Sequence, residues 1–336
     1  MKIHKLWLEE WLPMFGVKGA LADTLEFINM DVEIDGERQI RVITAAETDE
    51  GKVVVFKLVH EPMFHKELIE SQIEFSQKLR VAGLNTTYQF KAEGSYVLDV
   101  VLEGMNCCLT CEEYIGSRPD HLSAVLEYEI GKVLGESHRL SEKLKLEVGF
   151  SRLYHEVMRK SSYRKVWNST CSEWVDPQWI EQMTEIHDGL MEEIQAEFTS
   201  LPKAAVQGDV YGVNNVAVTD EGELAIFDYN LAGDEVLVAD FLLSWYRTIG
   251  DMNMHTFINE ETVDLMWNAF STGYLKSRPL SKEEYQIGNK LSAVLGLIYL
   301  TKLAIELEGC GRVDDAKACL SAGERLLKHP RWLEEK

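Results

Sequence analysis

The sequence lacks several features that would assign it to large classes of protein. It has no run of eighteen apolar residues, so no segment is predicted to cross a membrane. Its only Cys-x-x-Cys pair, Cys108 and Cys111, has no second pair to complete a four-ligand zinc site. The opening segment 1–16 carries two glutamates where a signal peptide needs an apolar core. We therefore expect a cytoplasmic protein whose cysteines stay reduced.

Basic residues are also scarce. The chain has 34 lysines and arginines against 56 aspartates and glutamates, which gives a formal net charge of −22. Such a surface repels phosphate backbones and anionic lipid headgroups, so neither nucleic acid nor a membrane is an expected partner. A negative field attracts a cationic small molecule, although the same charge also serves solubility alone.

The composition is that of a globular protein. Of the 336 residues, 46% are apolar and 27% are charged, enough for one large domain or two of ordinary size. The N-terminal part reads as strand, strand, helix, strand, from the alternation of β-branched residues and the spacing of apolar ones. These four elements are expected at 40–44, 53–59, 67–81 and 95–102.

Beyond Glu103 the periodicity is mostly helical. One short β-hairpin interrupts it, because two apolar runs are joined by a glycine-containing loop between residues 213 and 228. The pattern predicts an α+β fold, with an N-terminal unit over 1–102 and a larger, mainly helical unit over 103–336. Helices are expected from Pro119 to Leu134 and over 179–198, 291–307 and 313–327.

The hairpin carries three oxygen-bearing side chains. Asp209 and Asn214 lie in the loop that leads into it, and Asp228 ends its second strand. Phosphoryl transfer needs such a set, because one carboxylate must orient the attacking hydroxyl while two hard oxygen ligands hold Mg²⁺ on the phosphates.

This segment, Gln207-Gly208-Asp209 followed by Asn214 and Asp228, resembles the catalytic hairpin of the aminoglycoside phosphotransferase and choline kinase-like family. The resemblance implies a two-lobed protein kinase-like fold, with a small β-rich nucleotide-binding lobe and a larger, mostly helical lobe that holds the catalytic hairpin and the acceptor. It also implies transfer of the γ-phosphate of ATP, with Mg²⁺, to a hydroxyl group of a small molecule. Asp209 then corresponds to the catalytic base, and Asn214 and Asp228 correspond to the metal ligands.

Two further segments resemble this family. Leu134 to His138 matches the end of a family helix, and Asp240 matches an aspartate that braces the catalytic loop. The family's histidine before Gly-Asp is replaced by Gln207, which can still donate and accept hydrogen bonds. A glycine-rich phosphate loop is absent, since Gly36 is the only glycine in its expected place.

The resemblance assigns Lys57 to the nucleotide phosphates. Lys57 stands among apolar residues in the expected strand 53–59, where a lysine is costly to bury unless an acid pairs with it. The family's register places Gln72 at the partner position, with Glu70 and Glu74 on either side, and we favour Glu70. The alternative is that Lys57 simply points outward. The strand 95–102 resembles the interlobe hinge, where backbone groups near its end would meet adenine.

The acceptor is the least determined part. Its pocket is expected to be formed by the stretches 154–179 and 241–274. The aromatic residues there are consistent with a cation-π cage or with ordinary core packing, and nearby acids are consistent with pairing to amino groups. An aminoglycoside, an amino alcohol such as choline, and a neutral sugar or hydroxy-amino acid all remain open. A catalytically weak, pseudokinase-like nucleotide binder and a helical interaction protein are the alternatives to an active kinase. The aromatic candidates for the acceptor pocket are Trp167, Trp174, Trp179, Trp245, Tyr246 and Trp267. The acidic candidates are Glu173, Asp176, Asp234 and Glu235.

Overall fold

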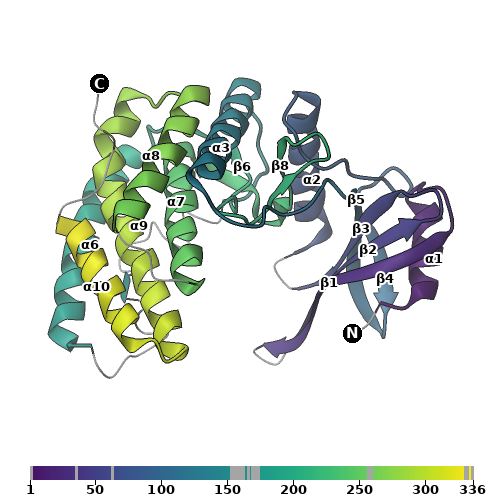
Figure 1. The fold of residues 1–336 in the computed structure, drawn as a ribbon, viewed down its shortest axis with the longest axis horizontal. Helices are drawn as coiled ribbons and strands as arrows, with labels where there is room; N and C mark the ends of the chain where they lie inside the picture. The colour runs from purple at the N-terminus through teal and green to yellow at the C-terminus, as the bar shows by residue number, and fades with distance from the viewer. Residues whose placement is uncertain are drawn as a thin grey trace. The chain divides into compact units, whose positions relative to one another are not determined.

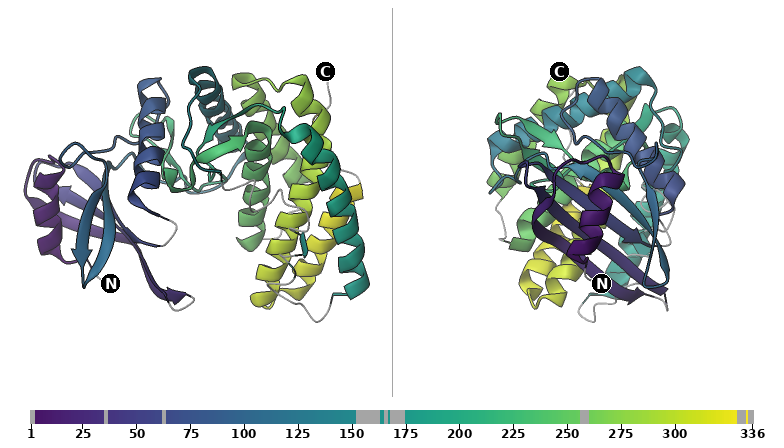
Figure 2. Two further views of the ribbon diagram at one scale, coloured as in Figure 1. Left: turned by 180° about the vertical axis from the view of Figure 1, so that it is seen from behind. Right: turned by 90° about the vertical axis from the view of Figure 1, so that its right-hand side faces the viewer.

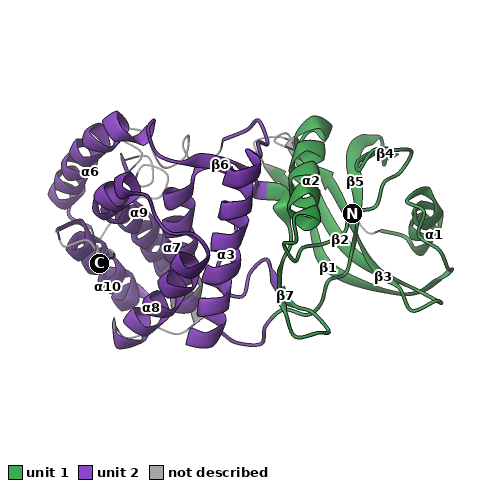
Figure 3. Cartoon of the chain, turned by 90° about the horizontal axis from the view of Figure 1, so that it is seen from above, with its two compact units in different colours: residues 1–118, 217–230 green, residues 119–216, 231–336 purple. Residues whose placement is uncertain are grey.

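The computed structural model describes residues 3–34, 37–61, 64–151, 163–164, 167, 175–255, 260–328 and 333. The chain forms two compact units, coloured separately in Figure 3. The first comprises Met1–Arg118 and Ala217–Asn230, and the second comprises Pro119–Val216 and Leu231–Lys336. The first unit therefore extends beyond the boundary predicted at Leu102, and it also includes most of the hairpin.

A five-stranded antiparallel sheet forms the first unit, in the order β1-β2-β3-β5-β4 (Figure 1). The strands predicted at 40–44 and 53–59 are confirmed within β2 and β3, and the last residues of the segment predicted at 95–102 form β4. Two strands were not predicted, β1 and β5. The strands are β1 (Leu21–Ile34), β2 (Glu37–Thr48), β3 (Val53–His60), β4 (Leu98–Leu102) and β5 (Met105–Glu113).

Alternation along β3 gives the sheet two different faces. Phe56 and Leu58 are fully buried on the face covered by helix α1 (Lys5–Met14), which Figure 2 shows lying across the sheet. The ring of Phe56 lies 5.9 Å from that of Trp11, so α1 closes one apolar core. Lys57 points to the opposite face, because successive side chains of a strand point to opposite sides. The predicted helix is confirmed as α2 (Lys66–Val81), whose side chains share a pocket with this second face.

The predicted hairpin is confirmed as β7 (Val216–Val218) and β8 (Leu224–Ile226). It is attached to the segment after α2, since Ile226 N donates to Asn85 O at 3.1 Å. A short turn, η1 (Tyr229–Leu231), follows the second strand. The residues after β8 are thereby brought to the same unit as Lys57.

The second unit is mainly helical (Figure 1). Three of the helices predicted in this part of the chain are confirmed within α6, α9 and α10, and the fourth, expected from Pro119, is α3, which begins at Ala124. None of the helices among the described residues is both long and apolar enough to span a membrane. The elements are α3 (Ala124–Leu144), α6 (Pro177–Phe198), β6 (Lys203–Val206), β9 (Gly233–Val236), α7 (Leu237–His255), α8 (Glu260–Ser277), α9 (Lys282–Gly309) and α10 (Val313–Lys328).

Glycines allow α3 and α8 to approach very closely. A Cβ atom added to Gly131 would lie 2.0 Å from Phe270 O, and one added to Gly273 would lie 2.0 Å from Tyr128 O. Real side chains cannot occupy these spaces, so the two backbones meet without intervening atoms. This contact fixes α8 along α3.

One carboxyl group in α3 is buried without compensation. Glu127 is fully buried, and neither of its carboxylate oxygens has a hydrogen-bond partner among the described residues. Burial raises the pKa of Glu127 to about 8, because the charged form loses its hydration. The group is therefore expected to be protonated in the folded protein at neutral pH.

Replacing Glu127 by glutamine is expected to raise the melting temperature at pH 9 but hardly at pH 5. The pKa of Glu127 is 4.5 in an unfolded chain and about 8 in the folded protein. The contribution of the protonated side chain to the free energy of unfolding is therefore fully present below pH 4.5 and is lost as the pH rises to about 8. Each unit of pKa difference corresponds to about 1.4 kcal/mol. Thermal unfolding at both pH values measures the effect, with Glu129→Gln on the partly exposed face of α3 as the control. An equal shift at both pH values would contradict this ionisation.

Candidate active site

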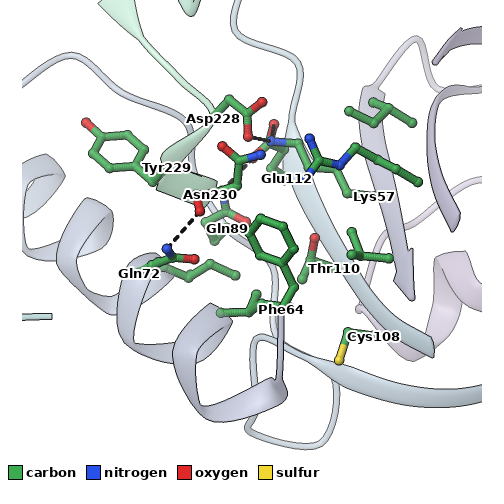
Figure 4. Close-up of a pocket in the computed structure, with 15 residues that line it drawn as sticks. Lys57, Phe64, Gln72, Gln89, Cys108, Thr110, Glu112, Asp228, Tyr229 and Asn230 are labelled. Atoms are coloured by element: carbon green, nitrogen blue, oxygen red, sulfur yellow. Dashed lines mark hydrogen bonds and ion pairs between the residues drawn. The ribbon is translucent and has the colours of Figure 1, made fainter. Parts of the chain in front are cut away.

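A pocket in the first unit brings together Lys57, Gln72 and Asp228, which the sequence singled out, with polar residues that it did not (Figure 4). Lys57 enters it from β3, Glu112 from β5, and Gln72 from α2. Asp228 and Asn230 enter from the turn after β8. The pocket is therefore lined by the sheet, by α2 and by the turn after β8, and Lys57 lies among them.

Lys57 is held by two carboxylates. Its Nζ lies 2.8 Å from Glu112 Oε1 and 3.2 Å from Asp228 Oδ1. The side chains of Lys57, Glu112 and Asp228 are only 16%, 7% and 20% exposed, so these charges are poorly hydrated. Burial alone would lower the pKa of Lys57, but Asp228 and Glu112 together raise it above its usual value. The lysine is therefore a fixed positive charge inside the pocket and not an outward-facing surface residue.

The acid that pairs with Lys57 differs from the prediction. Glu70, the favoured partner, instead accepts hydrogen bonds from Ser95 Oγ and, at 3.1 Å, from Val97 N. Gln72 Nε2 donates to Asn230 O at 2.8 Å. The partner is Glu112, because β5 and not β4 lies beside β3 in the sheet.

Glu112 was missed although its strand carries a readable signal. In β5, Cys107, Leu109 and Cys111 are buried on the core face, and alternation assigns Cys108, Thr110 and Glu112 to the other face, where they line the pocket. Its carboxylate also accepts from Gln89 Nε2 at 2.6 Å. The same strand carries the chain toward the end of the first unit, so the segment between the units follows β5 and not the predicted strand 95–102.

The turn after β8 is unusual in its backbone. Asp228 has φ of 58°, a left-handed conformation that few residues other than glycine, asparagine and aspartate adopt readily. Beside it, Asn230 Oδ1 is buried and has no hydrogen-bond donor among the described residues. A carboxylate and an unsatisfied amide oxygen on one pocket wall are oxygen ligands of the type that Mg²⁺ prefers.

The second unit holds the loop with the predicted base. Asp209 Oδ1 accepts a hydrogen bond from Arg247 Nη1, and Asp209 Oδ2 accepts one from Asn215 Nδ2 at 2.8 Å. Asp209 N donates to Gln207 Oε1 at 2.6 Å, so Gln207 braces the loop that carries Asp209. Gly208 has φ of 80°, and an added Cβ there would lie 2.5 Å from Leu231 O. The loop therefore needs glycine at this position.

Asn215, and not Asn214, contacts Asp209. Besides the carboxylate, Asn215 Nδ2 binds Asp209 O at 2.9 Å, and Asn215 itself is buried with φ of 57°. Asn214 is half-buried, and its backbone N donates to Tyr211 O at 2.9 Å. The doublet Asn214-Asn215 was the signal in the sequence, but spacing alone did not distinguish its two members.

The remaining predicted residues of this unit have structural contacts. Asp240 Oδ2 lies 3.0 Å from His138 Nε2, and His138 Nδ1 lies 2.9 Å from the Tyr274 hydroxyl, all in the core. Asp234 accepts from the backbone N of Val148 and of Gly149, each at 2.8 Å.

Of the readings left open for the tryptophans, core packing applies to those of α7 and α8. Trp245 and Trp267 are buried with their ring centroids 5.3 Å apart, in a cluster that includes Phe241, Phe270 and Tyr274. Trp179 Nε1 donates to Glu324. Trp174 and Glu173 lie outside the described residues. The described tryptophans of α7 and α8 are therefore core residues.

Comparisons with known proteins give a fold and no sequence relative. No protein-family model matches the chain, and no curated protein matches its sequence. Among solved structures, an amicoumacin kinase in complex with AMP-PNP and Ca²⁺ is 13% identical with a TM-score of 0.65, over 97% of this chain and 94% of that one. A microcompartment-associated aminopropanol kinase has the same identity and TM-score, over 97% and 98%. A choline kinase from Streptococcus pneumoniae is 13% identical with a TM-score of 0.53, over 96% and 98%.

These similarities extend over nearly the whole of each chain. At such low identity they establish the fold alone, and they confirm the predicted protein kinase-like α+β fold with a β-rich unit and a mainly helical unit. The arrangement of elements in the two units agrees with that assignment.

Proposed function

We propose that this protein is a small-molecule kinase that transfers the γ-phosphate of ATP, with Mg²⁺, to a hydroxyl group of a small acceptor. The observation that carries the proposal is the buried Lys57 clamped between Glu112 and Asp228 in one pocket. A kinase needs a strand lysine that an acid positions for the phosphates, and it needs an aspartate for the metal. The kinases among the similar structures support the same reading.

Each polar group has a role in this proposal. Lys57 binds the nucleotide phosphates, and Glu112 takes the positioning role first expected of Glu70. Asp228 is a ligand of Mg²⁺, which would neutralise charge on the phosphates when bound. The buried, donor-free Asn230 Oδ1 fits a nearby cation. The second predicted ligand, Asn214, shares this candidacy with Asn215.

Asp209 is the proposed base. Its carboxylate accepts a hydrogen bond on each oxygen, from Arg247 and from Asn215, and an ionised carboxylate has about four acceptor positions in all. Such an anchored carboxylate orients the hydroxyl and takes its proton as the phosphoryl group arrives.

A panel of acceptors tests the proposal. Purified protein with ATP and Mg²⁺ is incubated with amino alcohols, aminoglycosides, neutral sugars and hydroxy-amino acids, and phosphorylated products are detected by mass spectrometry. We expect an acceptor with a cationic nitrogen, because the chain carries a net charge of −22. A neutral preferred acceptor would contradict only that expectation. Thermal stabilisation by ATP and Mg²⁺ without transfer to any acceptor would contradict the kinase itself.

Replacing Asp228 by asparagine is expected to remove the Mg²⁺ dependence of nucleotide binding. Asparagine tolerates the left-handed backbone of this position, so the variant isolates the loss of charge from backbone strain. Isothermal titration with AMP-PNP, with and without Mg²⁺, measures the effect. Asp220→Asn, in the exposed turn of the same hairpin, is the matched control. Affinity and Mg²⁺ dependence equal to those of the wild type would exclude Asp228 as a ligand, and the same titration on Asn214→Ala and Asn215→Ala distinguishes the two amides.

A further inference from the structure

An arginine outside every expected motif contacts the proposed base. Arg247, on α7, donates through Nη1 both to the Asp209 carboxylate and, at 2.7 Å, to Gly208 O. Its guanidinium carbon also lies 5.8 Å from the centroid of the Tyr211 ring. One side chain therefore contacts three residues of the loop that carries the base.

Arg247 belongs to a face of α7 that supports this loop. Ser244 Oγ donates to Val210 O, and Thr248 Oγ1 accepts from Gly212 N at 2.9 Å. Positions three and four residues apart share one helix face, so Ser244, Arg247 and Thr248 all face the loop. Ser244 and Thr248 bind only its backbone. Arg247 is the member of the three that also holds the carboxylate.

The contact is between charged groups with little access to water. The side chains of Arg247 and Asp209 are each 22% exposed. Burial lowers the pKa of Arg247, but Tyr299, Asp209 and Asp240 raise it above its usual value, so the guanidinium stays charged. A hydrogen bond between charged partners is stronger and more directional than a neutral one. It therefore restricts the carboxylate to one orientation.

We propose that Arg247 is a positioning residue that sets the direction of the Asp209 carboxylate toward the acceptor hydroxyl. The proposal rests on the kinase function above. Arg247 holds Oδ1 and Asn215 holds Oδ2, so the plane of the carboxylate is defined from two sides. A carboxylate that turns away by about 1 Å loses on the order of 10²-fold in rate. Arg247 acts on the reaction only through Asp209.

A double-variant cycle tests whether Arg247 acts through Asp209. We expect Arg247→Met to lower kcat by about 10²-fold while the KM for ATP changes by less than about twofold. In an Asp209→Ala background the same substitution is expected to change the residual kcat by less than about twofold, because the group it positions is gone. Arg247→Lys is expected to recover part of the rate. Arg139→Met, which removes an arginine paired on the surface of α3, is the matched control.

Two results of this cycle overturn the proposal. One is a loss of similar size in both backgrounds, which would show that Arg247 acts independently of Asp209, as a brace or as an acceptor ligand. The other is a wild-type kcat in a folded Arg247→Met variant, with folding judged by thermal unfolding.

The contact has a readout that does not depend on activity. Nitrogen NMR of the arginine Nη groups is expected to show slowed rotation for Arg247 in the wild type and fast rotation in Asp209→Ala. Fast rotation already in the wild type overturns the positioning role. Slow rotation in a wild type that phosphorylates no acceptor would contradict the kinase function and leave the ion pair established.

Discussion

Replacing Asp209 by asparagine is expected to lower kcat by about two to four orders of magnitude, the usual contribution of a positioned general base. Asparagine retains an oxygen that can accept from Arg247, so the loop keeps its main contact. It cannot take the proton of the acceptor hydroxyl. Steady-state turnover with the acceptor identified from the panel measures the effect, and titration with AMP-PNP is expected to give an unchanged dissociation constant.

Asp209→Ala provides a second variant with a different structural cost. It leaves the poorly hydrated guanidinium of Arg247 without its carboxylate, so we expect a lower melting temperature than for Asp209→Asn. Similar losses of kcat in the two variants, with different melting temperatures, would assign the effect to chemistry. Wild-type turnover in Asp209→Asn would remove Asp209 as the base.

Local patterns were sufficient for the hairpin and for the strand that carries Lys57. The hairpin was predicted because its two apolar runs and its turn are contiguous, and Lys57 because a charge inside an apolar strand is conspicuous. Alternation along β3 left two orientations of Lys57 open, outward to solvent or into a pocket, and the structure places it in the pocket. These inferences use neighbours in the sequence, where periodicity is informative.

The partners of these residues depend on long-range pairing, which periodicity does not report. Glu112 reaches Lys57 because β5 is inserted between β3 and β4, so the strand nearest in sequence is not the nearest in the sheet. Because β5 follows β4 in the chain, the first unit continues to Arg118, beyond the end predicted at Leu102. Arg247 lies seven residues beyond Asp240 on α7, outside every motif found in the sequence, and only the folded second unit brings it to Asp209.

The predicted ligand Asn214 and the residue that contacts Asp209 are adjacent in the sequence. Asn214 has the family's spacing from Asp209, yet the loop turns so that the buried, left-handed Asn215 meets the carboxylate. Two adjacent residues of a tight turn point in different directions, and sequence alone does not say which one faces inward. The metal-ligand assignment of Asn214 stays a prediction until both amides are replaced.

Replacing Lys57 by methionine is expected to impair both nucleotide binding and stability. In the folded protein Lys57 neutralises two carboxylates, and Glu112 is only 7% exposed. Removing one partner of a buried ion pair leaves uncompensated charge and costs about 3 kcal/mol, the lower end of the usual range because Asp228 keeps some access to water. Chemical denaturation measures the stability, and titration with Mg²⁺ and AMP-PNP measures the affinity.

A second substitution separates these two effects. In Lys57→Met/Glu112→Gln the buried acid is neutral, so much of the lost stability is expected to return, whereas nucleotide affinity stays low because the cation that would meet the phosphates is still missing. Lys66→Met removes an exposed lysine paired with Asp99 and is expected to change neither quantity appreciably. If the double variant regained nucleotide affinity together with stability, Lys57 would be a structural ion-pair partner and not a phosphate ligand. If it regained neither, the loss in the single variant would not arise from the unpaired Glu112.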